Sequence, residues 1–210
     1  MLQFLWKSFI TLFVVINPVA VIATFVSLTS NFSSEKRNKI ALKAVFISTI
    51  LLVAFAIIGD KLLDTMSISE SAFRIAGGFL LLLSAIEMVV RTTSANNSKL
   101  EDVHNGTDIS VYPLAIPLIA GPGALTSIVV LMRQAELYNL LFSFGVVLIL
   151  ITVLLITYLG MLGGNYLMRM IGISGANVMT RVCGIMLAAL AIQNIITGIV
   201  VTVKNAFNLS

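Results

Sequence analysis

The chain has 210 residues, of which 59% are hydrophobic and only 10% are charged, and its mean hydropathy is +1.06. Soluble domains carry about 25% charged residues, so this composition excludes a soluble protein and indicates a polytopic integral membrane protein. The formal net charge of +4 does not indicate a nucleic-acid partner, because the basic residues lie in short segments between apolar runs.

Six apolar runs are each long enough to cross a hydrocarbon core about 30 Å thick. They predict an all-α polytopic membrane protein with six transmembrane helices. In chain order the runs cover residues 8–28, 41–58, 72–90, 111–131, 140–162 and 182–201.

Asn17 and Pro18 interrupt the first run. Pro18 lacks a backbone N–H and clashes with the preceding turn, which frees carbonyl groups inside the membrane. The Asn17 amide can both donate and accept hydrogen bonds in the gap. We therefore predict a discontinuous first helix.

The third run begins with the block Phe73-Arg74-Ile75-Ala76-Gly77-Gly78. Arg74 lies near the first helical turn, where a cation opposes the helix dipole and needs compensation. It could snorkel to the interface, donate to carbonyl ends of the broken helices, or contact a solute carboxylate. Gly77 and Gly78 are expected to allow close helix packing.

Residues 92–109 are rich in Ser, Asn, Thr, Asp and Glu and show no apolar periodicity, which predicts a solvated linker. The linker separates a first transmembrane repeat, residues 1–91, from a second, residues 110–210. The sole histidine, His104, lies in the linker without Cys or carboxylate companions at ligand spacing. We expect no metal site and no cofactor.

The fourth run contains a second break, Gly121-Pro122-Gly123, whose proline lies 104 positions after Pro18. Glycines on both sides of a proline let the backbone open and let a ligand approach closely. Helix breaks in corresponding positions of two halves are the best sequence indication of a transporter binding site.

The sixth run repeats features of the third, because Arg181 lies 107 positions after Arg74 and Gly184 follows it. Arg181 and Gly184 are assigned the same structural or gating roles as Arg74, Gly77 and Gly78. Each copy has three crossings, an odd number, so the second copy must enter from the opposite face. The sequence thus predicts two inverted three-helix repeats with discontinuous first helices.

The basic residues predict the orientation of the chain. Loops after the first, third and fifth helices contain or flank eight basic residues, whereas five lie on the other side of the membrane. The side with more basic residues is expected to face the cytoplasm, so both termini should face outward and the linker inward. The eight are Lys36, Arg37, Lys39, Lys43, Arg91, Lys99, Arg169 and Arg181; the five are Lys7, Lys61, Arg74, Arg133 and Lys204.

The two breaks together are predicted to form a solute site. A half-helix that begins at a break presents unpaired N–H groups suited to a carboxylate, and the freed carbonyls suit an ammonium group or a cation. Thr24, Ser27, Thr126 and Ser127 could line this site, or could be small residues at helix contacts. The predicted binding residues are Asn17, Pro18, Thr24, Gly121, Pro122, Gly123 and Thr126. The alternative is that both prolines only produce packed kinks.

Glu87 is the one acidic residue inside an apolar run, near the inner end of its helix. It could carry a proton if buried, but a hydrated, ionised side chain is favoured. Coupling to a proton or to sodium stays open, as does the oligomeric state, including a homo-oligomer. Because the apolar runs contain neither a histidine nor two acids, an enzyme is not expected.

The chain resembles the MarC family of bacterial inner-membrane proteins. The resemblance rests on Asn17-Pro18, on Pro113-Leu114-Ala115-Ile116-Pro117 leading into Ala120-Gly121-Pro122-Gly123, and on the blocks around Arg74 and from Arg181 to Gly184. It covers nearly the whole chain. It implies a bacterial inner-membrane location and a transporter, since a related branch is described as moving glycine and alanine.

The predicted cavity contains glycine, alanine, short hydroxyls and one amide, with no mid-membrane charge. Together with the resemblance, this favours a secondary transporter of small neutral amino acids with alternating access, because a charged side chain would stay unpaired there. Valine at Gly121 or Gly123 is expected to fill the cavity while the protein still folds. The alternatives are an exporter of another small metabolite or drug and a non-transporting membrane scaffold.

Overall fold

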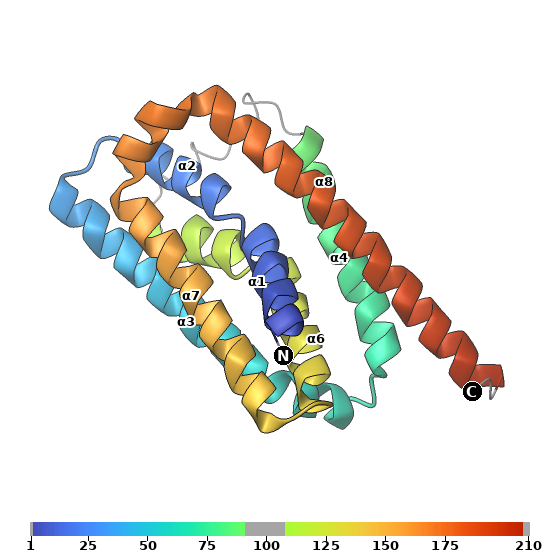
Figure 1. Cartoon of the computed structure of the whole chain (residues 1–210). Coiled ribbons are helices and arrows are strands. Elements are labelled where there is room, and N and C mark those ends of the chain that lie inside the picture. Colours follow the sequence, from blue (N-terminus) through green and yellow to red (C-terminus); the bar gives the residue numbers. More distant parts are fainter. Residues whose placement is uncertain (1, 91–107, 208–210) are drawn as a thin grey trace.

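A computed structural model of the chain describes residues 2–90 and 108–207 (Figure 1). Every regular element in these two ranges is a helix. Five helices are long and apolar enough to cross a membrane, and one bent pair of helices brings the number up to six. The predicted all-helical membrane architecture is therefore confirmed. Most of the predicted linker 92–109, including His104, lies outside the described residues.

The first two helices, α1 (Leu2–Ile16) and α2 (Pro18–Leu28), together form one candidate span with a break between them. The next helix, α3 (Ser34–Thr65), is much longer than the apolar run 41–58. Its first turns are polar but favourable for a helix, because Ser33 accepts a hydrogen bond from the Lys36 N–H and Lys39 pairs with Glu35 one turn earlier.

The fourth predicted helix is far less regular than expected. After α4 (Glu70–Val90), the segment η3 (Ser110–Ile119) forms wide helical turns that Tyr112 and Ile116 interrupt with extended backbone. Each of these residues precedes a proline, whose ring disfavours the helical conformation of its neighbour. The regular helix α6 (Pro122–Glu136) then leaves η3 at an angle of 51°.

The last two helices are α7 (Leu140–Leu162) and α8 (Gly164–Phe207). A sharp bend divides α8 at Gly172, where φ is +69°, a conformation that glycine adopts without steric cost. The membrane-spanning part begins at Ser174, eight residues before the predicted run 182–201. Polar residues such as Asn177 and Arg181 made this first part of the helix look less apolar than a span.

Helices α4 and α8 lie side by side along one flank of the molecule, and the other helices form a bundle beside them (Figure 1). The buried residues of the main hydrophobic core come only from α1, α2, α3, η3, α6 and α7, and from Ala120 between η3 and α6. A second, smaller cluster joins α4 and α8 to α1, through Val14, Leu81, Ala85, Leu187 and Ala191. The fold therefore has two packing units that meet along α1 and α6.

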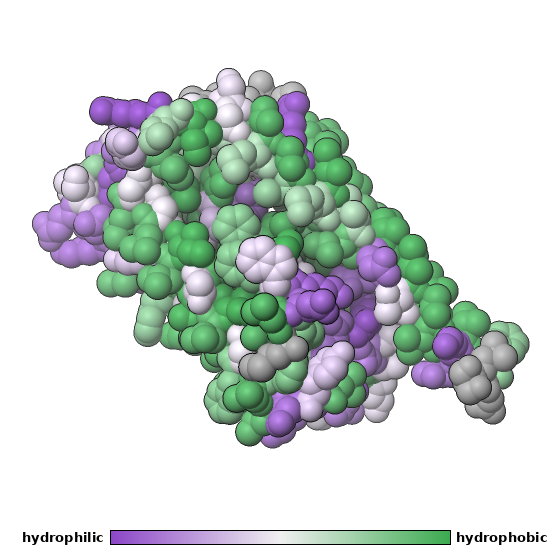
Figure 2. Space-filling view, in the orientation of Figure 1, coloured by the Kyte–Doolittle hydropathy of each residue, from purple (hydrophilic) through white to green (hydrophobic). Residues whose placement is uncertain are grey.

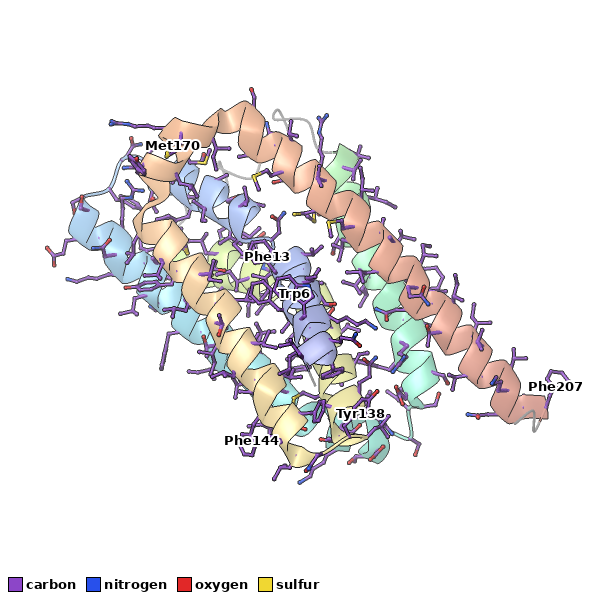
Figure 3. The ribbon with its side chains drawn as sticks, viewed as in Figure 1. Trp6, Phe13, Tyr138, Phe144, Met170 and Phe207 are labelled. Atoms are coloured by element: carbon purple, nitrogen blue, oxygen red, sulfur yellow. The ribbon has the colours of Figure 1, made fainter. Side chains whose placement is uncertain are left out.

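The two chain ends lie at the same end of the molecule, which we call the terminal end, while the turns after α2 and α7 lie at the opposite end (Figure 1). Apolar side chains cover most of the visible flank between these ends (Figure 2). Trp6 on α1 and Tyr138 after α6 are strongly exposed, and Tyr138 lies at the terminal end (Figure 3). Exposed aromatics of this kind are typical of a membrane interface.

Candidate functional site

The first helix break is centred on Asn17, which has left-handed backbone angles (φ 47°, ψ 69°). Asparagine tolerates this conformation better than most residues. Its side-chain oxygen Oδ1 accepts a hydrogen bond from the Ala20 N–H (3.4 Å) and so caps α2, whose first residue is Pro18. The side-chain nitrogen Nδ2 is buried and has no hydrogen-bond partner in the described part of the chain. An unpaired buried donor therefore lies inside the break.

The second break is centred on Gly121, which directly precedes the first residue of α6, Pro122. A Cβ atom at Gly121 would lie only 2.4 Å from the Pro117 carbonyl oxygen, so the tight bend needs glycine here. This corrects the expectation for valine at Gly121, because the substitution would distort the bend and not merely fill a cavity. Pro122 itself is exposed.

The two breaks lie next to each other. A Cβ atom at Gly123 would be 3.6 Å from Val15 Cγ1 on α1 and 2.9 Å from Leu81 Cδ2 on α4. The missing side chain thus lets the first turn of α6 approach both helices. The predicted break residues Asn17 and Gly123 therefore belong to one region of the molecule, although more than one hundred positions separate them.

The predicted threonines differ in their surroundings. The Thr126 hydroxyl donates to the Pro122 carbonyl (2.9 Å), and its methyl group fills the space where a side chain on Gly77 would lie. Thr126 is buried between α6 and α4, whereas Thr24 is half-buried on α2. Thr126 thus lies at a helix contact as well as next to the second break.

The two predicted arginines are not equivalent. Arg74 donates from Nη2 to the Glu70 carboxylate one turn earlier (2.6 Å), an ion pair that the sequence interpretation did not consider. Its Nε is buried without a partner among the described residues. Arg181 is exposed on α8. Gly78 and Gly184, in contrast, both lie where α4 and α8 touch.

A polar pocket opens between α1 and α6 on one side and α4 and α8 on the other. It contains about 60 Å³ of space, and hydrophilic atoms gather between α1 and the α4/α8 pair in Figure 2. Val15 and Leu81 belong both to the pocket and to the surroundings of Gly123, so the pocket reaches the second break. Its lining residues are Lys7, Thr11, Val15, Leu81, Ser127, Val130, Leu131, Gln134, Leu190, Gln193 and Asn194.

Sequence reasoning did not bring the polar members of this pocket together. A helical spacing of three, four or seven places Lys7 with Thr11 on α1, and Ser127 with Gln134 on α6, on one face of each helix. That periodic polar face, which continues past the end of an apolar run in both helices, was the available signal. Which helix faces would meet could not be read from it.

Charged side chains at the terminal end join α3, α4 and α6. Arg133 of α6 donates from Nη1 to Asp60 (2.6 Å) and lies 3.5 Å from Glu70 through Nε, while Asp64 is 3.7 Å away. Because Glu70 also pairs with Arg74, these five residues form one network. In the described part of the chain no group of three or more His, Cys, Asp or Glu side chains is arranged to hold a metal ion.

At the opposite end, Asp108 connects η3 to α3. Its carboxylate accepts hydrogen bonds from the Lys43 ammonium and from the Ser110 N–H (3.0 Å). These bonds, with the Lys43 bond contributing most, lower the pKa of Asp108 to about 2. Asp108 therefore stays ionised at neutral pH and anchors the start of η3.

Comparison of the amino-acid sequence with known proteins identifies the family of the chain. Residues 2–203 match the model of the MarC family, described as MarC family integral membrane protein. The chain is 36% identical to the UPF0056 membrane protein MJ1677 of Methanocaldococcus jannaschii, over 94% of this chain and 97% of that protein. It is also 36% identical to the UPF0056 membrane protein YhcE of Escherichia coli, over 92% of this chain and 91% of that protein. No solved structure matches the chain.

Proposed function

This chain belongs to the MarC family of integral membrane proteins, and from that premise we propose that it is a secondary transporter of small neutral amino acids such as glycine and alanine. The observation that carries the proposal is the proximity of the two helix breaks, since Gly123 at the start of α6 lies beside Val15, two residues before Asn17. Broken helices inside a membrane persist where a ligand, an ion or a water-filled cavity satisfies the freed backbone groups.

The chemistry of the breaks supports a small zwitterionic solute. The unpaired Asn17 Nδ2 and the backbone N–H groups of Gly123 and Ala124 in the first turn of α6 supply donors for a carboxylate. Carbonyls freed by the prolines supply acceptors for an ammonium group. Pro117 and Leu81 already lie close to the Cβ positions of Gly121 and Gly123, so little room is left there for a large side chain on the solute. We assign solute contacts to Asn17, Pro18, Thr24, Gly121, Pro122, Gly123 and Thr126.

The proposal includes two inverted repeats, with α1/α2, α3 and α4 corresponding to η3/α6, α7 and α8. The packing supports this relation because two pairs of helix contacts are reciprocal. Helix α2 packs on α8 as α6 packs on α4, and α1 packs on α7 as η3 packs on α3. A two-fold axis in the membrane plane would generate each contact from its counterpart.

Alternating access would then involve movement of the α4/α8 pair relative to the remaining helices. The hydrophobic clusters support this, because the cluster that holds α4 and α8 together reaches the main bundle only through side chains of α1. Gly77, Gly78, Gly184, Arg74 and Arg181 lie in the α4/α8 pair and are assigned structural or gating roles.

We further propose a bacterial inner-membrane location with both termini periplasmic. The end of the molecule opposite the two termini carries Lys36, Arg37, Lys39 and Lys43 in a short segment. The positive-inside rule carries most weight for such short segments. Reporter fusions after Ser98 should report the cytoplasm and fusions after Phe207 the periplasm. The opposite pattern would reject this orientation.

Counterflow of labelled glycine and alanine into proteoliposomes that contain the full chain tests the proposal. Wild type should exchange both solutes, and Gly123→Val should abolish exchange, because the new side chain reaches Leu81 and Val15 between the breaks. Gly163→Val is the matched control, since the nearest atom to its Cβ position is the Leu159 carbonyl oxygen at an ordinary 3.5 Å. Absence of exchange by wild type, or normal exchange by Gly123→Val, would contradict the proposal.

A further inference from the structure

The polar pocket lies outside the predicted solute site and has its own chemistry. Its walls come from both packing units: α1 and α6 from the main bundle, α4 and α8 from the flank. Of its polar side chains, Ser127 is buried, Thr11, Gln134 and Asn194 are half-buried, and Lys7 and Gln193 are exposed. Ionisable and polar side chains that face a cavity between membrane helices often have a functional partner.

The polar groups of this pocket are one cation and several neutral groups. The Lys7 ammonium has three N–H bonds and no acceptor, while the amides of Gln134 and Asn194 and the Ser127 hydroxyl can each donate as well as accept. No carboxylate lines the pocket, and Lys7 forms no ion pair in residues 2–90 and 108–207. The pocket therefore holds one positive charge with no opposite charge beside it, together with neutral groups that can donate hydrogen bonds.

Ser127 provides a second, independent observation. It lies on the pocket wall and is 3% exposed, yet its Oγ has no hydrogen-bond partner in the described part of the chain. Buried hydroxyls are normally bonded, and several serines and threonines in these helices, such as Ser8, Ser48 and Thr126, donate to a carbonyl one turn earlier. Ser127 does not make that bond, so its hydroxyl keeps an unused donor at the pocket wall.

We propose that the polar pocket is an outer binding site for the carboxylate group of the solute, with Lys7 as its cation and Ser127 as a hydroxyl donor; this inference rests on the proposed transport function. A carboxylate accepts several hydrogen bonds and complements one ammonium group surrounded by neutral donors. The available space fits a few water molecules or a solute of a few heavy atoms. The solute would then pass from Lys7 along Val15 and Leu81 to the break at Gly123.

Binding to the purified full chain in lipid nanodiscs tests the site without transport. Acetate, which has the carboxylate but no amine, should bind, and methylammonium should not. Lys7→Gln should weaken acetate and glycine binding about tenfold, whereas Lys7→Arg should retain both, because a charge-assisted hydrogen bond to a partly exposed cation has about this strength. Lys61→Gln removes an exposed lysine at the same end of the molecule and is the matched control. Equal binding by Lys7→Gln and wild type would overturn the proposal.

Chemical labelling gives a second measurement that does not depend on Lys7 variants. Ser127→Cys combined with Cys183→Ala gives a protein with a single thiol, which lies in the wall of the polar pocket. An anionic methanethiosulfonate reagent should label it at least fivefold faster than a cationic one of similar size, and acetate should protect it. Faster labelling by the cationic reagent, or no protection, would overturn the proposal.

These results separate the pocket from the transport function. Glycine exchange by wild type that is unchanged in Lys7→Gln, with no acetate binding, would reject the pocket and leave transport in place. Lys7-dependent acetate binding by a protein that exchanges no glycine or alanine would support the pocket and reject the proposed transport function.

Discussion

Gly78 of α4 lies directly against the backbone of Ala191 in α8: a Cβ atom at Gly78 would be 2.9 Å from the Ala191 carbonyl oxygen. The same relation recurs along both helices, since the Cβ position of Gly184 is 3.2 Å from the Ala85 oxygen. Small residues thus occupy every seventh position of each helix, the period at which two helices keep one seam in contact. They are Ser71, Gly78 and Ala85 on α4 and Gly184, Ala191 and Gly198 on α8.

Gly78→Val should separate the α4/α8 pair. The added side chain meets a backbone oxygen, which no change of rotamer can move, so we expect a loss of about 1–3 kcal/mol in the free energy of unfolding. Thermal unfolding in detergent measures this loss. Gly163→Val, at a glycine with no close neighbour beyond its own helix, should leave stability within about 0.5 kcal/mol of wild type. Equal stability of the two variants would show that the seam is not tightly packed.

Asn17→Ala and Asn17→Gly should separate the structural from the binding role of Asn17. Both variants lose the cap on α2 and the buried Nδ2 donor, but only alanine is strained by the positive φ of 47°. Asn17→Ala should therefore be less stable than Asn17→Gly by about 1–2 kcal/mol. If Nδ2 contacts the solute, both variants should lose glycine affinity to the same extent. An affinity loss that follows stability would instead assign Asn17 a structural role only.

The helix breaks could be predicted from sequence because their causes are local. Proline removes a donor at its own position, and Asn17 and Gly121 each directly precede one. The same rule applies to Tyr112 and Ile116, which precede prolines, yet the long apolar run around them led to the prediction of a helix interrupted only at Gly121-Pro122. Local composition thus predicted an apolar segment here but not the irregular course of η3.

The polar pocket and the Arg133 network could not be predicted, because both depend on how helices meet. Arg133 and Asp60 are 73 positions apart and lie on helices whose relative rotation no periodicity reveals. The pair Arg74–Glu70 was accessible, since residues four apart on a helix are neighbours. Sequence therefore located the breaks of the candidate site but not the polar wall beside it.

Arg133→Gln should weaken the junction of α3, α4 and α6. It leaves Asp60, Asp64 and Glu70 near one another without their shared cation, so we expect a loss of about 2 kcal/mol in the free energy of unfolding. Chemical denaturation in detergent measures it. Lys39→Gln, which removes only a highly exposed pair with Glu35, should cause no measurable change. A similar loss in both variants would mean that the Arg133 network contributes nothing specific.

The anchor at Asp108 should respond to acid. Its pKa is about 2 in the folded protein and 3.8 without the fold, so its stabilising effect is complete above pH 3.8 and is lost as the pH falls toward 2. The difference in melting temperature between wild type and Asp108→Asn should thus be constant from neutral pH to about pH 4 and shrink below it. The pair is about half exposed, so the difference should be small. A difference that grows in acid would contradict the assigned pKa.

Gly77 and Thr126 should show strong energetic coupling across the boundary between the two packing units. A Cβ atom at Gly77 would lie 1.8 Å from Thr126 Cγ2, so Gly77→Ala alone should reduce the free energy of unfolding by about 1–3 kcal/mol. Thr126→Ser removes that methyl group and keeps the hydroxyl that donates to Pro122, so the double variant should recover most of the loss. Thr126→Val retains the methyl group and should not rescue Gly77→Ala. If the losses of Gly77→Ala and Thr126→Ser simply add, α4 and α6 do not meet at this point.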